Sequence, residues 1–84
     1  MKNPELTTAN GIPESLTNLF YRDYCNVIAI QDATEDSVTG AELVEKLNKL
    51  RLFSKFTLDR ETQEYARLIT VDCWGQTHYF KAWK

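Results

Sequence analysis

The segment from Thr39 to Arg51 constrains the fold more than any other part of this sequence. Its apolar residues at positions 43, 44, 47 and 50 recur at i, i+1, i+4 and i+7, which places them on one face of a helix. Thr39 followed three residues later by Glu42 is the pattern of an N-terminal capping box. A helix with a single apolar face has to bury that face against another layer, and the segments around it have the composition of strands.

The length of 84 residues with 43% hydrophobic residues predicts one domain, residues 1–84, with a small core. The sequence has no apolar run of the length that spans a membrane, and residues 1–5 lack the apolar block of a signal peptide. Cys25 and Cys73 are far apart and form no Cys-x-x-Cys motif, which favours reduced thiols. We therefore expect a cytoplasmic, intracellular protein with no membrane partner.

The first half of the chain is expected to hold an arm, a short helix and one strand. Residues 1–11 show no periodicity and predict a mobile or loosely docked arm. A helix is then predicted to start at Pro13, with Leu16, Leu19 and Phe20 on one face. The nearly continuous apolar run at residues 24–31 predicts an inner strand covered on both faces, and residues 32–38 predict an acidic loop.

After Arg51 the hydrophobic period becomes two, which indicates strands. Residues 55–58, 65–74 and 77–83 alternate, with Gly75-Gln76 as a two-residue hairpin turn. The resulting fold class is α+β. A short N-terminal helix, one strand and the amphipathic helix precede a three-stranded antiparallel meander, giving a four-stranded sheet with the helix packed on one face.

The predicted turn at Gly75-Gln76 assigns side chains to the two faces of the hairpin. It places Trp74 opposite Thr77 and Leu68 opposite Trp83. The face toward the helix then carries Ile69, Val71, Phe80 and Ala82. The other face carries Leu68, Thr70, Asp72, Trp74, Tyr79, Lys81 and Trp83. A slip by one residue would exchange the two sets on one strand.

The second face of this hairpin is the predicted partner-binding surface. Its members are Leu68, Asp72, Trp74, Tyr79, Lys81 and Trp83. Large aromatic side chains with a cation among them are enriched at protein interfaces. Two alternatives compete with a site for another protein. The helix at residues 13–22 could fold over this face as a second core layer, or the face could be a homodimer interface.

A nucleic-acid site on the same face is the alternative from another class. Aromatic rings on an open sheet can stack bases, and Lys55, Arg67, Lys81 and Lys84 could meet phosphates. The net charge of -2 counts against it, and no stretch has the strand signature of sheet-based RNA binders.

Cys73 and His78 would lie opposite each other in the predicted hairpin, which is the nearest approach to a catalytic or metal pair. Asp72 would point to the other face and could not orient His78, and zinc would lack ligands. A buried thiol beside a half-exposed imidazole is the simpler interpretation. We therefore predict no enzyme, no metal and no cofactor.

Clustered acids before the amphipathic helix form a secondary acidic patch, made of Asp32, Glu35 and Asp36. Their spacing does not match a calcium-binding EF-hand, whereas acids ahead of a helix suit its dipole. The patch could still meet a basic surface on another protein.

Together these features predict a small non-catalytic protein-binding module, an inhibitor or regulator that covers a surface of a partner. Small inhibitors encoded by phages and mobile elements share this size and fold class, which is an analogy of size and fold alone. A single-stranded nucleic-acid-binding domain is the main alternative, and a cysteine-dependent enzyme is the third.

Overall fold

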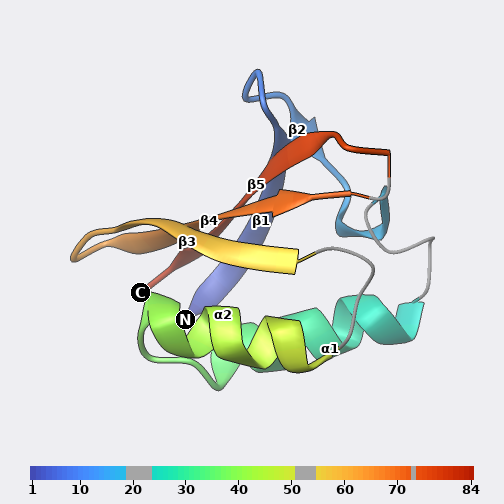
Figure 1. Cartoon of the computed structure of the whole chain (residues 1–84). Coiled ribbons are helices and arrows are strands. Elements are labelled where there is room, and N and C mark those ends of the chain that lie inside the picture. Colours follow the sequence, from blue (N-terminus) through green and yellow to red (C-terminus); the bar gives the residue numbers. More distant parts are fainter. Residues whose placement is uncertain (19–23, 51–54, 73) are drawn as a thin grey trace.

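The fold combines a five-stranded antiparallel sheet with two helices, in a computed structural model that describes residues 1–84 except 19–23, 51–54 and 73 (Figure 1). The strand order in the sheet is β2-β1-β5-β4-β3. The elements in chain order are β1 (Lys2–Thr8), β2 (Pro13–Glu14), the 3-10 turn η1 (Leu16–Asn18), α1 (Tyr24–Glu35), α2 (Gly40–Lys49), β3 (Lys55–Glu61), β4 (Tyr65–Val71) and β5 (Thr77–Trp83). The predicted α+β class is confirmed, with five strands in place of four.

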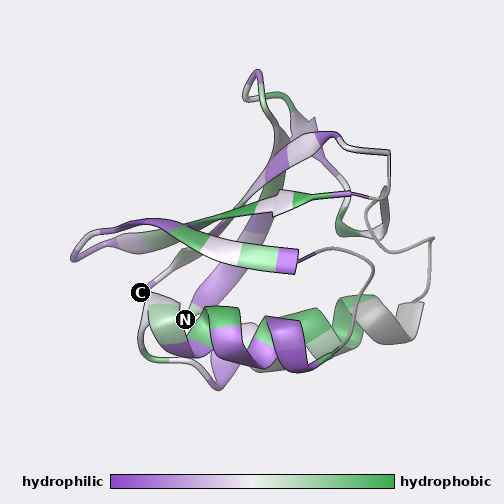
Figure 2. Cartoon of the chain, viewed as in Figure 1, coloured by the Kyte–Doolittle hydropathy of each residue, from purple (hydrophilic) through white to green (hydrophobic). Residues whose placement is uncertain are grey.

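Helix α2 confirms the amphipathic helix predicted from the sequence. The Thr39 hydroxyl accepts a hydrogen bond from the backbone N–H of Glu42 at 3.2 Å and so caps its first turn. The Glu42 carboxylate accepts from the N–H of Val38 at 3.4 Å, one residue before the partner expected in a capping box. In Figure 2, α2 carries hydrophobic and hydrophilic residues in alternating patches, as expected of a helix with one buried face.

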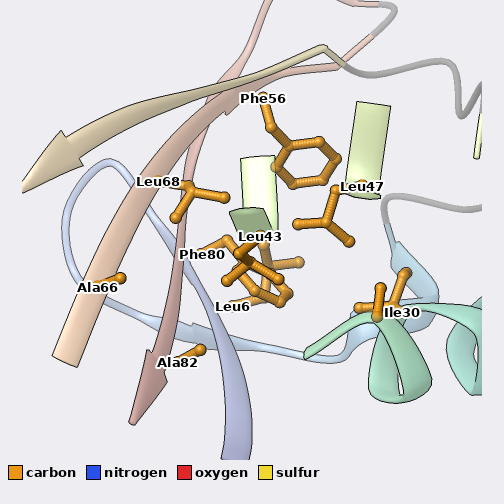
Figure 3. Close-up of a cluster of buried hydrophobic side chains, with 10 residues drawn as sticks. Leu6, Ile30, Leu43, Leu47, Phe56, Ala66, Leu68, Phe80 and Ala82 are labelled. Carbon is orange, nitrogen blue, oxygen red and sulfur yellow. The ribbon is translucent and has the colours of Figure 1, made fainter. Parts of the chain in front are cut away.

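Both helices lie on the same face of the sheet, and the core fills the space between the two layers (Figure 1). Figure 3 shows the core side chains pointing toward one another from the helices and the strands. The rings of Phe56 on β3 and Phe80 on β5 meet edge to face, with centroids 5.9 Å apart. The buried hydrophobic residues are Leu6, Ile30, Ala33, Leu43, Leu47, Phe56, Ala66, Leu68, Phe80 and Ala82.

The N-terminal segment corrects the prediction of a mobile or loosely docked arm at residues 1–11. Strand β1 lies between β2 and β5 and pairs with both, and Leu6 is only 1% exposed in the core. Strand-like alternation is missing from the sequence around Asn3, which has a positive φ of 53°, and Pro4, which has no N–H to donate to a neighbouring strand. The register with β5 shifts at this point, between Lys2 and Glu5.

The predicted strand at residues 24–31 is wrong, since this segment belongs to helix α1. Its buried face uses Ile30, Ala33 and Thr34, and Ser37 continues the same stripe beyond the helix. The Thr34 and Ser37 hydroxyls donate to the carbonyls of the residues four positions earlier, at 2.8 and 2.7 Å. Because their hydroxyls are hydrogen-bonded to the backbone, these polar residues can complete the buried face of the helix. A pattern of hydrophobic residues alone therefore does not show the helical period.

The predicted helix starting at Pro13 is replaced by β2 and the turn η1 over the residues that the structure describes. Leu16 packs against the core from η1. Leu19 and Phe20, which were expected on the same helical face, lie outside the described residues.

The register of the β4–β5 hairpin differs from the prediction by three residues. Val71 pairs with Thr77, and Leu68 lies opposite Phe80 instead of Trp83. The connection is a five-residue loop, residues 72–76, because one carboxylate oxygen of Asp72 accepts hydrogen bonds from two backbone N–H groups within it. An odd shift exchanges the faces of one strand, so the faces of β5 are as predicted and those of β4 are reversed.

Candidate functional site

The face of the sheet turned away from the helices is the candidate site, and we call it the open face. Neither of the two described helices lies over it (Figure 1). The pairing of β1 and β4 with β5, and of β3 with β4, determines which residues it carries. They are Glu5, Thr7, Lys55, Thr57, Arg60, Tyr65, Arg67, Ile69, Val71, Thr77, Tyr79, Lys81 and Trp83.

Lys81 is held between two aromatic rings at the end of the open face. Its Nζ lies 4.1 Å from the ring centroid of Tyr65 and 4.1 Å from that of Trp83. The two rings are cross-strand partners with centroids 5.5 Å apart. Cation–π attraction to both rings restricts the lysine side chain, so its ammonium group has a defined position on the surface.

Arg67 occupies the middle of the open face and has two kinds of partner. Its guanidinium carbon lies 4.9 Å from the ring centroid of Tyr79. One oxygen of Asp59, Oδ2, accepts from its Nε at 2.7 Å and lies 2.6 Å from its Nη2, so two guanidinium nitrogens share this oxygen in an ion pair. Asp59 can reach Arg67 because β3 has a register irregularity between Leu58 and Arg60.

A hollow of about 430 Å³ lies over these residues and is bordered by the turn between β1 and β2. It is lined by Glu5, Thr7, Ala9, Asn10, Gly11, Tyr65, Arg67, Tyr79 and Lys81. Two phenol hydroxyls, an ammonium group and a guanidinium group can donate hydrogen bonds into it, and among these lining residues Glu5 is the one carboxylate. Its chemistry therefore suits a ligand group that accepts hydrogen bonds or carries negative charge.

The structure brings together half of the residues that the sequence predicted for the partner site. Tyr79, Lys81 and Trp83 share the open face as predicted. Leu68 lies in the core instead, because the reversed faces of β4 turn it toward the helices. Trp74 lies in the β4–β5 loop and is 70% exposed.

The predicted protein-binding surface omits Tyr65 and Arg67, although Arg67 is among the cations expected to meet phosphates in the nucleic-acid alternative. Alternation along β4 in the predicted register turns both residues to the inner face. Both contact residues of β5 that the prediction did include, through the cation–π pairs already described. The sequence does contain a signal for these two residues, because an aromatic residue and a cation two positions apart on β4 match the aromatic and cationic alternation of β5.

Asp72, the sixth predicted site residue, belongs to a buried cluster around His78. His78 is 6% exposed; its Nδ1 lies 2.6 Å from Glu14 Oε2 and its Nε2 lies 2.7 Å from Asp72 Oδ2. Burial alone lowers the pKa of His78, but the hydrogen bonds to Asp72 and Glu14 outweigh it and hold the pKa above 6.5. Burial likewise raises the pKa of Asp72, yet hydrogen bonds from His78 and from backbone N–H groups leave it below 3.8.

This cluster is a structural ion network. Both ring nitrogens of His78 face carboxylates, so an imidazolium that donates at both satisfies the site and neither nitrogen is available as a base. The two carboxylates lie on opposite sides of the ring, and across the described residues no group of three or more His, Cys, Asp or Glu is placed to hold a metal ion. Cys73, predicted opposite His78, is outside the described residues, and Thr70 takes that position.

The residues of the acidic patch are exposed as predicted, but two of them lie on a helix and not in a loop. Asp32, Glu35 and Asp36 are all exposed, with the first two on α1 and Asp36 directly after it. The predicted loop at residues 32–38 is therefore partly helical, and the patch lies at the carboxyl end of α1, where the dipole disfavours acids. Its predicted role toward a basic partner stays a prediction.

Comparison of the chain with protein-family models, curated proteins and solved structures gave no match. In the part of the chain that the structure describes, neither helix has the length and apolar character needed to cross a membrane.

Proposed function

We propose that this chain is a small, non-catalytic protein-binding module that covers a surface of another protein, as an inhibitor or regulator does. The open face is the proposed contact surface. As part of the same proposal we place the protein in the cytoplasm, where its two cysteines would stay reduced.

The arrangement of aromatic side chains on the open face carries this proposal. Tyr65, Tyr79 and Trp83 are each half-buried on neighbouring strands, and cations fix them in place. Rigid aromatic groups lose little conformational entropy when a partner covers them, which is why such groups dominate the binding energy of many interfaces. The chain uses two tyrosines and a tryptophan here while its core is built from other residues.

The test is capture of a partner from the cells that produce the protein, followed by mass spectrometry. The double variant Tyr79→Ala with Trp83→Ala should lose the captured protein, because both side chains would supply contact area. Val38→Ala is the matched control, since Val38 is 73% exposed on a segment that connects the two helices. Circular dichroism checks that each variant is folded.

Retained capture by the folded double variant would contradict the proposed surface. Light scattering tests the homodimer alternative by comparing the molar mass of the wild-type protein with that of the double variant. A dimer formed through the open face would dissociate in the double variant.

Binding of single-stranded nucleic acid is the second candidate, and one observation favours it. The open face combines three aromatic rings with Lys55, Arg67 and Lys81, the two ingredients of stacking and phosphate contact. However, the cations already cover ring surfaces of Tyr65, Tyr79 and Trp83 that bases would need. Titration with short oligonucleotides at increasing salt concentration tests this candidate. Phosphate contacts predict an affinity that falls steeply with salt, and no binding at low salt would exclude the candidate.

A further inference from the structure

Three cations lie directly opposite one another across the open face, and we call them the cationic row. Arg60 on β3 pairs with Arg67 on β4, and Arg67 pairs with Lys81 on β5. Side chains directly opposite on neighbouring strands are close, so like charges in such pairs destabilise a sheet. The row is therefore an arrangement that the fold itself does not favour.

The charges around the cationic row relieve this repulsion only in part. Asp59 pairs with Arg67, but among the described residues neither Arg60 nor Lys81 has a carboxylate partner. Glu5 lies opposite Lys81 on β1, yet the ammonium group of Lys81 is directed to the rings of Tyr65 and Trp83. Two positive charges are thus left for an external anion.

Composition does not explain the cationic row, because the chain has a net charge of -2. The helix layer carries exposed acids, among them Asp32, Glu35, Glu42 and Glu45. Positive charge is therefore concentrated on the open face of an otherwise acidic protein. Proteins tend to depart from locally favourable patterns at functional sites.

We infer that the cationic row binds an acidic segment of the partner protein, a deeper form of the proposed function on which it rests. Carboxylates of the segment would meet Lys81 and Arg60, which neutralises the opposed charges. Lys81 is the anchor, because its two rings already hold the ammonium group in place. The adjacent hollow, with the hydroxyls of Tyr65 and Tyr79 at its lining, would receive a further acceptor group of the segment.

A carboxylate-bearing peptide fits this surface better than a nucleic acid. Stacked bases need free ring surfaces, whereas Lys81 and Arg67 lie over the rings of the open face. A carboxylate of a peptide can pair with Lys81 while this cation stays over its two rings. Positive and negative potentials that face each other also speed up association and exclude partners of the wrong charge.

The experiment measures binding of a fluorescein-labelled oligoglutamate peptide by anisotropy, beside an oligothymidylate of equal charge. Lys81→Gln should weaken peptide binding about fivefold, the upper end for one exposed ion pair. Lys81→Arg should restore it, because the charge and the ring contacts are kept. Lys49→Gln is the matched control, since it removes the same charge from the helix layer, where Lys49 pairs with Glu45.

Three results would overturn the inference: no peptide binding by the wild-type protein, equal losses in Lys81→Gln and Lys49→Gln, or tighter binding of the oligothymidylate. The proposed function has a separate readout, which is partner capture by the Tyr79→Ala, Trp83→Ala variant. If that variant loses its partner while oligoglutamate fails to bind, the protein-binding module stands and the acidic segment is refuted.

Discussion

Raising the pH above neutrality should destabilise this protein through His78. The pKa of His78 in the folded protein lies above its ordinary value of 6.5, so the folded state keeps a proton that the unfolded chain releases. The stabilisation is complete below pH 6.5 and is lost as the pH rises through the folded pKa. Above it, the neutral ring can donate to Glu14 or to Asp72, but not to both.

The size of the effect follows from the number of protons involved. One proton bound in the folded state alone lowers the free energy of unfolding by at most about 1.4 kcal/mol per pH unit. Since the two hydrogen bonds involve charged groups in a buried site, each contributes about 1.5–3 kcal/mol. For a domain of this size, 1 kcal/mol corresponds to a shift of about 4–8 °C in Tm.

Urea unfolding followed by circular dichroism between pH 6 and 9 measures this slope. His78→Gln is the control, because glutamine cannot carry the charge but can still donate to one carboxylate. No other ionisable residue differs between the two proteins, so the difference between the two curves reports the effect of His78 together with the carboxylates that it contacts. Parallel curves for wild type and variant in this range would refute the reasoning.

The same cluster predicts a loss of stability in acid. The pKa of Asp72 is held below 3.8, so its contribution is present above pH 3.8 and disappears as the pH falls through the lowered value. Asp72→Asn should flatten the acid limb of the stability curve, and an unchanged limb would contradict this assignment.

Substitutions at three further positions test the fold. Leu6→Ala should cost about 2–5 kcal/mol in urea unfolding, because it leaves a cavity in the core; an effect below 1 kcal/mol would favour a loose arm. Asn48→Ala should lower the free energy of unfolding by about 1–3 kcal/mol, because Asn48 Oδ1 accepts from the N–H of Phe56 at 2.9 Å and Asn48 Nδ2 donates to the carbonyl of Phe56 at 3.0 Å. Hydrogen exchange at the Phe56 amide should also become faster, and unchanged exchange would argue against these two bonds. Thr39→Ala should cost about 1 kcal/mol in thermal unfolding while Thr39→Ser stays near wild type; equal losses would rule out the cap.

Local signals predicted α2 and the strand character of β3, β4 and β5. The cap at Thr39 and the spacing of Leu43 and Leu47 are contained within one helix, so the sequence reveals them directly. Three residues of the predicted site, Tyr79, Lys81 and Trp83, share a face because they alternate along one strand. Patterns of this kind need no knowledge of the neighbouring strands.

The errors arose where the structure depends on partners that are distant in sequence or on hydrogen bonds of side chains. Leu6 has a core position only because β5 pairs with β1. Helix α1 completes its buried face with Thr34, which hydrophobicity does not mark as interior. Leu68 faces the core and not the site, because Asp72 stabilises a five-residue loop where Gly75-Gln76 predicted a two-residue turn. The longer loop shifts the register by an odd number of residues, which reverses the two faces of β4.

The pairing of β1 with β5 has a consequence for how the chain acquires its fold. Strand β1 borders β5, which lies about 70 residues later in the sequence, so most of the hydrogen bonds of β1 cannot form until β5 has been synthesised. Closing a loop of this length is entropically slow, which predicts that this domain folds only after β5 has left the ribosome, and not strand by strand before it. Until then Leu6 stays accessible to chaperones, and a short truncation of β5 would release the opposite end of the molecule.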